Sequence, residues 1–246
     1  AAPGCSNSIT GTASVVVTPT VGTPTTPTPT NSTICQGSGT VDFTTSATNA
    51  TSYNWSVTGS GNSVSGTGTT ATVTWDPNFS GTATVSVTAN GCNGPSAAAS
   101  TTVVVRPTPT ANISGTATVC QNASANVTFT NPQNIDVTVT YNINGGANQT
   151  VNVSGSGFAN VSAVTSTPGT FTYNLVSVAY QNAPQCSNNI SGFATVTVTP
   201  TVGTPSAITP ANPTICQGTA STDFSTSATN ATSYNWSVTG TGNTVS

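Results

Sequence analysis

Few side chains in this sequence could do chemistry: four carboxylates, one guanidinium, six thiols and three indoles. General acid–base catalysis needs a group that exchanges protons near neutral pH, and the chain contains no His, Glu or Lys. A serine nucleophile would therefore have no base beside it. We expect no enzyme activity, no catalytic residue and no cofactor. The acidic side chains are Asp42, Asp76, Asp136 and Asp223, and Arg106 is the only basic one.

Asp42 and Asp76 fall in the same predicted domain, so a paired-carboxylate site is the one catalytic alternative. Asp42, however, stands beside Phe43 in an alternating strand pattern, and Asp76 precedes Pro77, where Asp-Pro commonly starts a turn. We therefore interpret both carboxylates as structural. Four scattered Asp residues also cannot give Ca²⁺ several oxygen ligands at one point. A weak site built from main-chain carbonyls is the only metal alternative.

The six thiols favour covalent cross-links over metal binding. They belong to Cys5, Cys35, Cys92, Cys120, Cys186 and Cys216, with no Cys-x-x-Cys spacing and no His to complete a zinc site. Disulfides formed outside a reducing cytosol are the preferred interpretation, and buried free thiols are the alternative.

The three indoles raise a carbohydrate-binding alternative, because aromatic rings can stack on sugars. Trp55, Trp75 and Trp236 all lie on the apolar face of an alternating pattern, which favours packing in a core. Trp75, next to the "DPN" turn, is the candidate for sugar stacking. Its exposure would favour a carbohydrate-binding module.

Charge excludes several classes of partner. Charged residues make up 2% of the chain, against about 25% in ordinary globular proteins. One Arg cannot neutralise a run of phosphates, so neither nucleic acid nor an anionic membrane surface is an expected partner. No apolar run approaches the roughly 18 residues of a membrane span. With 34% apolar residues the chain can still form a core, with solvated faces built from Thr, Ser and Asn.

The elements that carry these residues are repeated. Residues 5–65 and 186–246 align without a gap, with 44 identities in 61 positions and a separation of 181 residues. Within this period, "TICQGSGTVDF" at Thr33 returns as "TVCQNASANVTF" at Thr118, a spacing typical of single β-sandwich domains. The period therefore predicts two domains, type A and type B. We expect the natural polypeptide to continue, because the sequence stops inside a second type A domain.

Composition places the boundaries between these domains. "TPTVGTPTTPTPT" at Thr18 and "TPTVGTPSAITPANP" at Thr199 carry Pro at short intervals, which favours extended, semi-rigid linkers. The predicted organisation is residues 1–18 as the C-terminal strand of a preceding type B domain, 19–30 as a linker, 31–106 as a type A domain, 107–111 as a linker, 112–200 as a type B domain, 201–213 as a linker and 214–246 as the N-terminal part of a second type A domain.

Alternation of apolar and polar residues predicts strands throughout and no helix. In type A, "SYNWSVT", "ATVTW" and "TATVSVTA" each place one apolar face toward a core, which Phe43, Val103 and Val105 complete. In type B, "NGG" at Asn144 separates two alternating runs as a hairpin turn, and Phe171, Tyr173 and Leu175 supply the inner face. The predicted fold class is all-β, with tandem Ig-like β-sandwich domains joined by Pro/Thr-rich linkers.

Order along the chain suggests how the cysteines pair. In each complete domain one Cys precedes an early strand and another follows a late one, which predicts the pairs Cys35–Cys92 and Cys120–Cys186. A loop of about 57 residues closed in this way should stabilise a domain by roughly 4 kcal/mol on the chain-entropy model. Cys5 and Cys216 have no partner within the sequence under this scheme.

The motifs "ICQG", "ATSYNWSVTGSG", "GTATVSVTANGC", "YNINGGANQTV" and "GTFTYNLVSV" carry a family resemblance. The chain resembles the tandem Ig-like or PKD-like repeats of very large surface proteins of Bacteroidetes, such as gliding-motility adhesins and other cargo of the type IX secretion system. This resemblance implies a β-sandwich fold, a cell-surface or secreted location and a long multidomain parent. Ala83 departs from the pattern, because an aromatic residue is common at this position in similar repeats.

Together these features predict a non-catalytic structural repeat of an extracellular cell-surface adhesin or fibre. The repeats would give reach, and a surface without like-charge repulsion could let copies assemble into filaments. The expected partners are neighbouring repeats or copies of the same chain, with surface glycans as a further candidate. Repeats of a carbohydrate-binding module are the alternative function.

Overall fold

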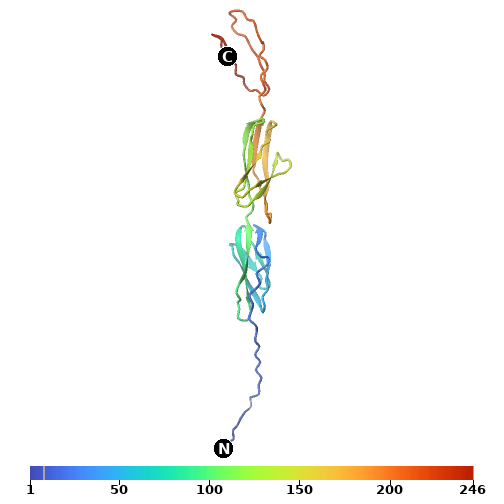
Figure 1. Cartoon of the computed structure of the whole chain (residues 1–246), viewed down its shortest axis with the longest axis vertical. Helices are drawn as coiled ribbons and strands as arrows, with labels where there is room; N and C mark the ends of the chain where they lie inside the picture. The colour runs from blue at the N-terminus through green and yellow to red at the C-terminus, as the bar shows by residue number, and fades with distance from the viewer. Residues whose placement is uncertain (8, 246) are drawn as a thin grey trace. The chain divides into compact units, whose positions relative to one another are not determined.

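The computed structural model describes residues 1–7 and 9–245, and every regular element in them is a β-strand. The chain divides into two compact units, Ala1–Thr108 and Pro109–Ser246. The first unit contains the type A domain and the second contains the type B domain (Figure 1). The all-β fold class, with tandem sandwich domains, is therefore confirmed. The part of the chain that the structure describes holds no helix with the length and hydropathy of a membrane span.

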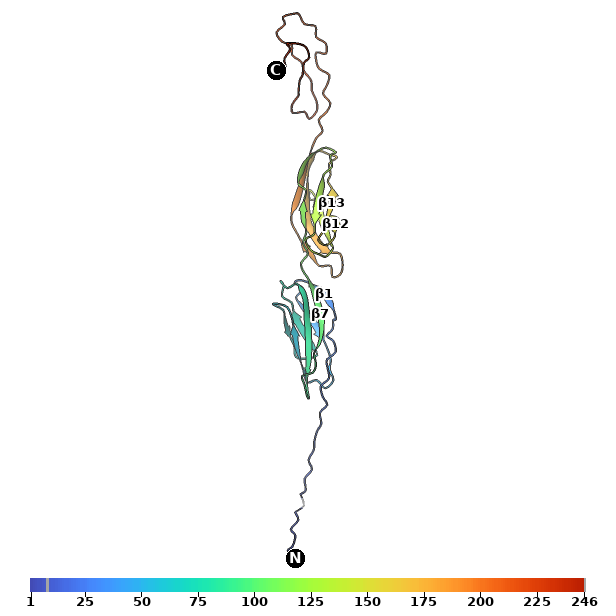
Figure 2. The same cartoon turned by 60° about the vertical axis from the view of Figure 1, so that its left-hand side comes forward.

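Type A consists of two sheets built from seven strands. One sheet has the order β1-β7-β6-β3 and the other β2-β5-β4. Its first and last strands are parallel neighbours, with Ser32 opposite Val103 and Cys35 opposite Arg106 (Figure 2). The strands are β1 (Ser32–Cys35), β2 (Thr40–Thr44), β3 (Ser52–Val57), β4 (Ser63–Ser65), β5 (Thr70–Thr74), β6 (Gly81–Asn90) and β7 (Ala99–Arg106).

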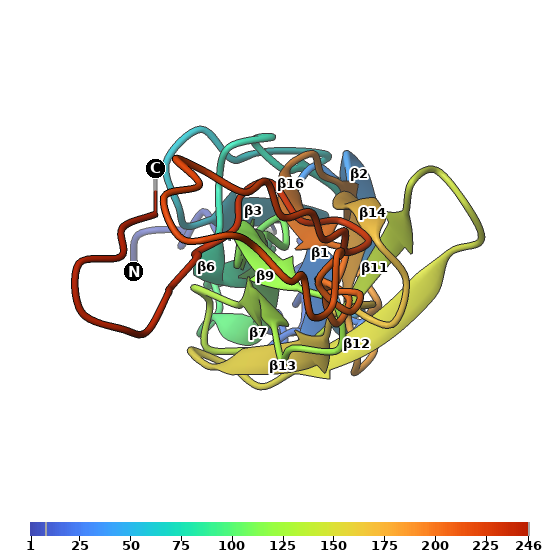
Figure 3. The same ribbon diagram turned by 90° about the horizontal axis from the view of Figure 1, so that it is seen from above.

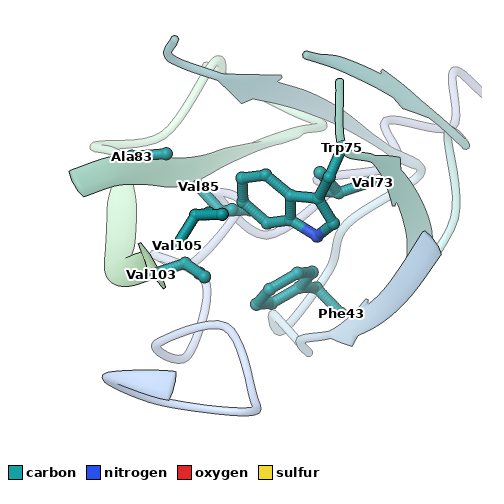
Figure 4. Close-up of a cluster of buried hydrophobic side chains, with 7 residues drawn as sticks. All are labelled: Phe43, Val73, Trp75, Ala83, Val85, Val103 and Val105. Carbon is teal, nitrogen blue, oxygen red and sulfur yellow. The ribbon is translucent and has the colours of Figure 1, made fainter. Parts of the chain in front are cut away.

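The core of type A lies between these sheets, as the alternating pattern predicts. Because successive side chains of a strand point to opposite faces, one residue in two along β5, β6 and β7 is buried. Figure 4 shows the indole of Trp75 surrounded by its neighbours from both sheets. The cluster consists of Phe43, Val73, Trp75, Ala83, Val85, Val103 and Val105. Small Ala83 is fully buried beside this indole cluster, so the core closes without an aromatic residue at that position.

The prediction that residues 19–30 form a linker is wrong for most of this segment. Residues 20–28 run along the edge of type A, where the Thr25 amide donates to the Ser46 carbonyl at 2.9 Å, and Thr28 and Thr44 exchange main-chain hydrogen bonds. Val21 is buried against Tyr53 and Val87. Prolines are tolerated here because an edge strand needs only some of its N–H groups for the ladder.

Type B also has two sheets, of order β13-β10-β8 and β12-β11-β14-β16-β9, and β15 pairs with β14. Figure 3 labels the five strands of the larger sheet. As in type A, the first strand of the larger sheet is parallel to the last, with Cys120 opposite Thr199. The strands are β8 (Asn112–Ser114), β9 (Ala117–Cys120), β10 (Asn126–Thr130), β11 (Val137–Ile143), β12 (Gln149–Val153), β13 (Phe158–Ser162), β14 (Gly169–Tyr180), β15 (Ser187–Asn189) and β16 (Phe193–Thr199).

Aromatic rings form the centre of the type B core. Phe129 and Tyr141 have ring centroids 4.8 Å apart, and Tyr141 and Tyr173 are 6.3 Å apart. The predicted inner-face residues Tyr173 and Leu175 are buried, whereas Phe171 is half-buried. The hairpin predicted at Asn144 joins β11 to β12, and Asn144 adopts a left-handed backbone with a φ of 53°.

Residues 201–245 reproduce the hydrogen bonds of the start of type A, 181 positions later. The Gly203 amide donates to the Thr229 carbonyl at 2.9 Å, as Gly22 does to Thr48. Thr209 and Ser225 form an isolated bridge, as Thr28 and Thr44 do. The described part of this segment contains no strand, and Trp236 is 39% exposed there, because the later strands that cover its counterpart in type A have no equivalent in the sequence.

Candidate cross-linking and interaction sites

The cysteines do not pair as predicted within the described domains. Cys5, Cys92, Cys120 and Cys216 are free, exposed thiols. Cys35 and Cys186 are both disulfide-bonded. The predicted bonds Cys35–Cys92 and Cys120–Cys186 are therefore absent, since each of them needs a thiol that is free.

Strand direction explains why Cys35 cannot reach Cys92. Cys35 ends β1 beside Arg106, at the end of type A where the chain leaves the domain. Cys92 follows β6 at the opposite end, where its carbonyl accepts the Val21 amide at 3.0 Å as the chain enters. We call these ends the C-terminal pole and the N-terminal pole. The ten-residue strand β6 separates them, and at about 3.3 Å per residue this is roughly 30 Å.

The same topology separates Cys120 from Cys186. Cys120 lies at the C-terminal pole of type B, opposite Thr199 at the end of the last strand. Cys186 lies at the N-terminal pole, where its carbonyl accepts the Tyr180 amide at 3.0 Å. The twelve residues of β14 run between the two poles, a distance of about 36 Å at 3.3 Å or less per residue. Neither domain can close a disulfide on itself.

The residue after each C-terminal-pole cysteine forms hydrogen bonds to the segment that leaves the domain. The side-chain oxygen of Gln36 accepts hydrogen bonds from the amide and hydroxyl of Thr108, at 2.8 and 3.2 Å. Gln121 repeats the contact in type B, where it accepts from the Thr201 hydroxyl at 3.4 Å and donates to the Ser166 carbonyl at 2.8 Å. Sequence reasoning missed this role, although the recurring Cys-Gln pair was its signal.

Trp75, the predicted sugar-stacking residue, is not available to a ligand. Its side chain is 2% exposed, in the middle of the type A core (Figure 4). Its ring stacks against Phe79 with centroids 6.5 Å apart. Its Nε1 finds no hydrogen-bond acceptor among the described residues. Burial of this kind is the outcome that favours core packing over carbohydrate binding at this residue.

Three of the carboxylates accept hydrogen bonds in turns or between paired segments. Asp42 accepts the Thr72 hydroxyl at 2.7 Å on paired strands, which fits a structural role. Asp76 accepts the Asn78 amide at 2.7 Å, in the turn that its sequence predicts. Asp136 accepts the Gly155 amide at 2.8 Å. Nowhere in residues 1–7 and 9–245 do three or more His, Cys, Asp or Glu side chains gather as a metal site would need.

The pKa of Tyr141 is raised by its surroundings. Burial raises the pKa of Tyr141 above its ordinary value of 10.0, and the neighbouring Tyr173 raises it further. The Tyr141 hydroxyl donates to the Gln149 side-chain oxygen at 2.9 Å across the β11–β12 pair. A group of this kind is structural, because its neutral form is the one that the core favours.

A buried amide in type B was also missed by sequence reasoning. The Asn131 side chain, 1% exposed, donates to the carbonyls of Ile135 and Ser154 at 2.9 and 3.1 Å. It also accepts the Gln133 amide at 3.0 Å. These bonds tie the β10–β11 connection to the end of β12. The segment "TNPQN" is polar in sequence, and nothing in it signals burial.

Residues 20–103 match the PKD-like domain family. The match begins at Thr20, so the matched residues include the edge segment 20–28, strands β1 to β6 and the first half of β7. It covers less than half of the chain. No curated protein matches the chain in sequence.

Solved structures of tandem domains are similar in fold. The I9–I11 tandem from titin is 15% identical, with a TM-score of 0.40, covering 77% of this chain and 69% of that one. A solved chain from a 1.5-MDa bacterial ice-binding adhesin is 19% identical, with a TM-score of 0.40, and the match covers 78% of this chain and 69% of that solved chain. Fibronectin(III)-like modules of Clostridium thermocellum CbhA are 13% identical, with a TM-score of 0.32, covering 72% and 94%. At these scores the similarity supports no functional argument.

Proposed function

We propose that this chain is a non-catalytic structural repeat of a long extracellular adhesin or fibre. One observation carries the proposal: in each domain the chain enters at one pole and leaves at the other. In the PKD-like domain, Val21 enters beside Cys92 and Arg106 leaves beside Cys35. Each added domain therefore extends the chain by about the length of its longest strand, roughly 30 to 40 Å. Repetition then gives reach without any new site.

The surface of these domains fits contact with other copies. After Gly81, the outward positions of β6 are Thr, Ser and Asn, and the whole chain carries a net charge of −3 from only five charged side chains. Such a surface has little like-charge repulsion to keep copies apart. Contacts between uncharged groups are also little affected by salt. We propose neighbouring repeats and copies of the same chain as the partners, and lateral assembly into filaments as the finer form of the function.

Location and origin follow from the resemblance of the sequence motifs. We propose a cell-surface or secreted location, in agreement with the disulfide-bonded Cys35 and Cys186, because disulfides persist in oxidising compartments. The resemblance to Bacteroidetes surface repeats supports export by the type IX secretion system.

Electron cryo-microscopy of the native surface material tests this function. We expect an axial repeat that matches two sandwich domains, together with ordered density between neighbouring chains. Isolated beaded threads would leave the spacer function standing and overturn filament assembly. A compact particle without an axial repeat would overturn both.

A glycan-binding screen of the purified chain separates the carbohydrate-binding alternative. Burial of Trp75 removes the platform on which that alternative rested, so we expect no binding that depends on this residue. Binding of a glycan that is lost on Trp55→Ala, in a variant that remains folded, would return the function to carbohydrate recognition. Trp55 is half-buried, with its Nε1 donating to the Gly68 carbonyl at 3.0 Å.

A further inference from the structure

Two aromatic rings lie on the outside of the type B sandwich. Among the described residues of the two complete domains, Phe158 and Phe193 are the most exposed large apolar side chains, each 68% exposed. Phe193 begins β16, and the next residue, Ala194, is fully buried. Because side chains alternate along a strand, Phe193 projects from the outer face of the larger sheet. Its ring therefore contributes little to the core.

The repeat shows that the strand does not need this ring. Thr12 is the counterpart of Phe193, 181 residues earlier, in the segment "GTASV" that corresponds to "GFATV". Threonine suits a strand position that faces water. The aromatic ring at Phe193 is thus a property of this domain and not a requirement of the fold.

Two asparagines extend the position of Phe193 into a row across three strands. Asn174 of β14 is the register partner of Phe193, and Asn142 of β11 is the register partner of Asn174. The two amides lie on the same face, because the Asn174 Nδ2 donates to the Asn142 Oδ1 at 3.1 Å. Neighbouring strands lie about 4.8 Å apart, so the row runs about 10 Å from β11 to β16.

This row offers an open hydrogen-bond acceptor and an open donor. The Asn174 Nδ2 also donates to the Thr172 carbonyl at 3.4 Å, whereas the Asn174 Oδ1 accepts no hydrogen bond from the described residues. The Asn142 Oδ1 also accepts the Gly145 amide at 3.0 Å, and the Asn142 Nδ2 has no acceptor among those residues. Thr195 pairs with Thr172 in the next row and adds hydroxyl groups beside the ring.

We propose that this row binds a neutral polysaccharide whose pyranose rings carry equatorial hydroxyls. Such a ring presents an apolar C–H face, which can stack on Phe193. The hydroxyls at its edge can pair with the open amide groups of Asn174 and Asn142, because a hydroxyl both donates and accepts.

The character of this sheet selects the class of ligand. Its strands β9, β11, β12, β14 and β16 carry no charged side chain, so the face has no group that would attract an acidic polymer. Small-molecule sites are concave, whereas an outward sheet face suits an extended chain that crosses several strands. The site is separate from Trp55 and Trp75, which both belong to type A, and it does not depend on filament assembly.

Nuclear magnetic resonance of the whole chain, titrated with the neutral hexasaccharide cellohexaose, tests the site. We expect the amide signals of Phe193, Asn174 and Asn142 to shift while those of type A stay unchanged. Phe193→Ala should weaken binding at least about ten-fold, because the stacking surface is lost. Asn174→Ala should weaken it about two- to ten-fold, because one hydrogen bond is lost.

Phe158→Ala is the matched control, because Phe158 is equally exposed but lies on β13, in the other sheet. This variant should leave the affinity unchanged, and both Phe variants should keep the unfolding midpoint of the unchanged chain. Absence of shifts at millimolar cellohexaose, shifts confined to type A, or an affinity unchanged by Phe193→Ala or by Asn174→Ala would overturn the site.

An acidic oligosaccharide, hexagalacturonate, tests the preference for a neutral ligand. We expect it not to bind, and binding as tight as that of cellohexaose would overturn the choice of ligand. Loss of the site leaves the spacer function standing, because electron cryo-microscopy of the axial repeat tests that function independently.

Discussion

The Gln36 side-chain oxygen accepts the Thr108 amide at 2.8 Å, so a residue at the end of the first strand fixes the start of the chain that leaves the domain. Gln36 follows β1 directly, and its own amide donates to the Arg106 carbonyl at 2.8 Å. Gln36 therefore contacts the end of the last strand through its main chain and the segment that follows it through its side chain. Gln121 is the equivalent residue at the C-terminal pole of type B, where it contacts Thr201.

Replacing Gln36 by Ala should release this contact. We expect the Thr108 amide to exchange with solvent about five-fold faster, because the lost hydrogen bond contributes about 1 kcal/mol. Hydrogen exchange followed by nuclear magnetic resonance measures this. Gln121→Ala is the matched control and should leave Thr108 unchanged. Equal protection of Thr108 in the wild type and Gln36→Ala would contradict the assigned role.

Because Val21 anchors the edge segment 20–28 in the core, its truncation should destabilise type A. Its side chain is buried against Tyr53 and Val87, and a Cβ added at Gly91 would lie only 2.9 Å from the Val21 Cβ. Val21→Ala should therefore lower the free energy of unfolding of type A by about 1–2 kcal/mol. Urea unfolding followed by tryptophan fluorescence measures the change.

The repeat supplies the control for that measurement. Val202 occupies the equivalent position 181 residues later and is 60% exposed. Val202→Ala should leave the unfolding midpoint of type A unchanged. If Val21→Ala were equally silent, residues 20–28 would be a linker after all.

Trp75→Phe should destabilise type A much less than Trp75→Ala. Trp75→Ala removes the indole from the core cluster shown in Figure 4, and we expect a loss of about 3–5 kcal/mol in the free energy of unfolding. Trp75→Phe keeps much of the apolar surface and removes an N–H that has no acceptor among the described residues. Its loss should be at most about half as large, since a buried unpaired donor itself costs about 1–3 kcal/mol. Equal losses in urea unfolding would mean that the indole N–H is hydrogen-bonded.

The raised pKa of Tyr141 predicts that type B loses stability at alkaline pH. Its pKa in the folded state is raised above 10.0, so the folded state keeps the proton when the unfolded state has lost it. The stability is therefore complete below pH 10 and falls as the pH rises from about 10 toward the folded-state pKa. Urea midpoints of the thiol-blocked chain between pH 8 and 11 should fall less steeply for Tyr141→Phe than for the unchanged chain. Parallel curves would contradict the shift.

Much of the core could be predicted from the sequence, because period-2 alternation directly reports which side chains share a face. Phe43, Trp75, Val103 and Val105 are buried as that pattern requires. The segment around Val21 was misread because closely spaced prolines suggest a free extended linker. Proline leaves the amides of Thr25 and Thr28 available, however, and those amides are the ones that pair with type A.

The cysteine pairing could not be predicted, because order along the chain does not say at which pole a residue lies. Cys35 and Cys92 are both adjacent to strand ends in sequence. Only the direction of β1 and β6 within the sheet, which depends on the parallel pairing of β1 with β7, places them at opposite poles. Gln36 and Asn131 were missed for a related reason, since each contacts a residue far away in the sequence, Thr108 and Ser154 respectively.

The parallel neighbours β1 and β7 determine how type A would respond to tension. A pull on the two ends of the domain draws these strands along their own axes in opposite directions. The hydrogen bonds between Ser32–Cys35 and Val103–Arg106 are then loaded together in shear, and not broken one at a time as when a hairpin is unzipped. β9 and β16 give type B the same loading geometry. Rupture of either domain must therefore break a whole strand interface at once.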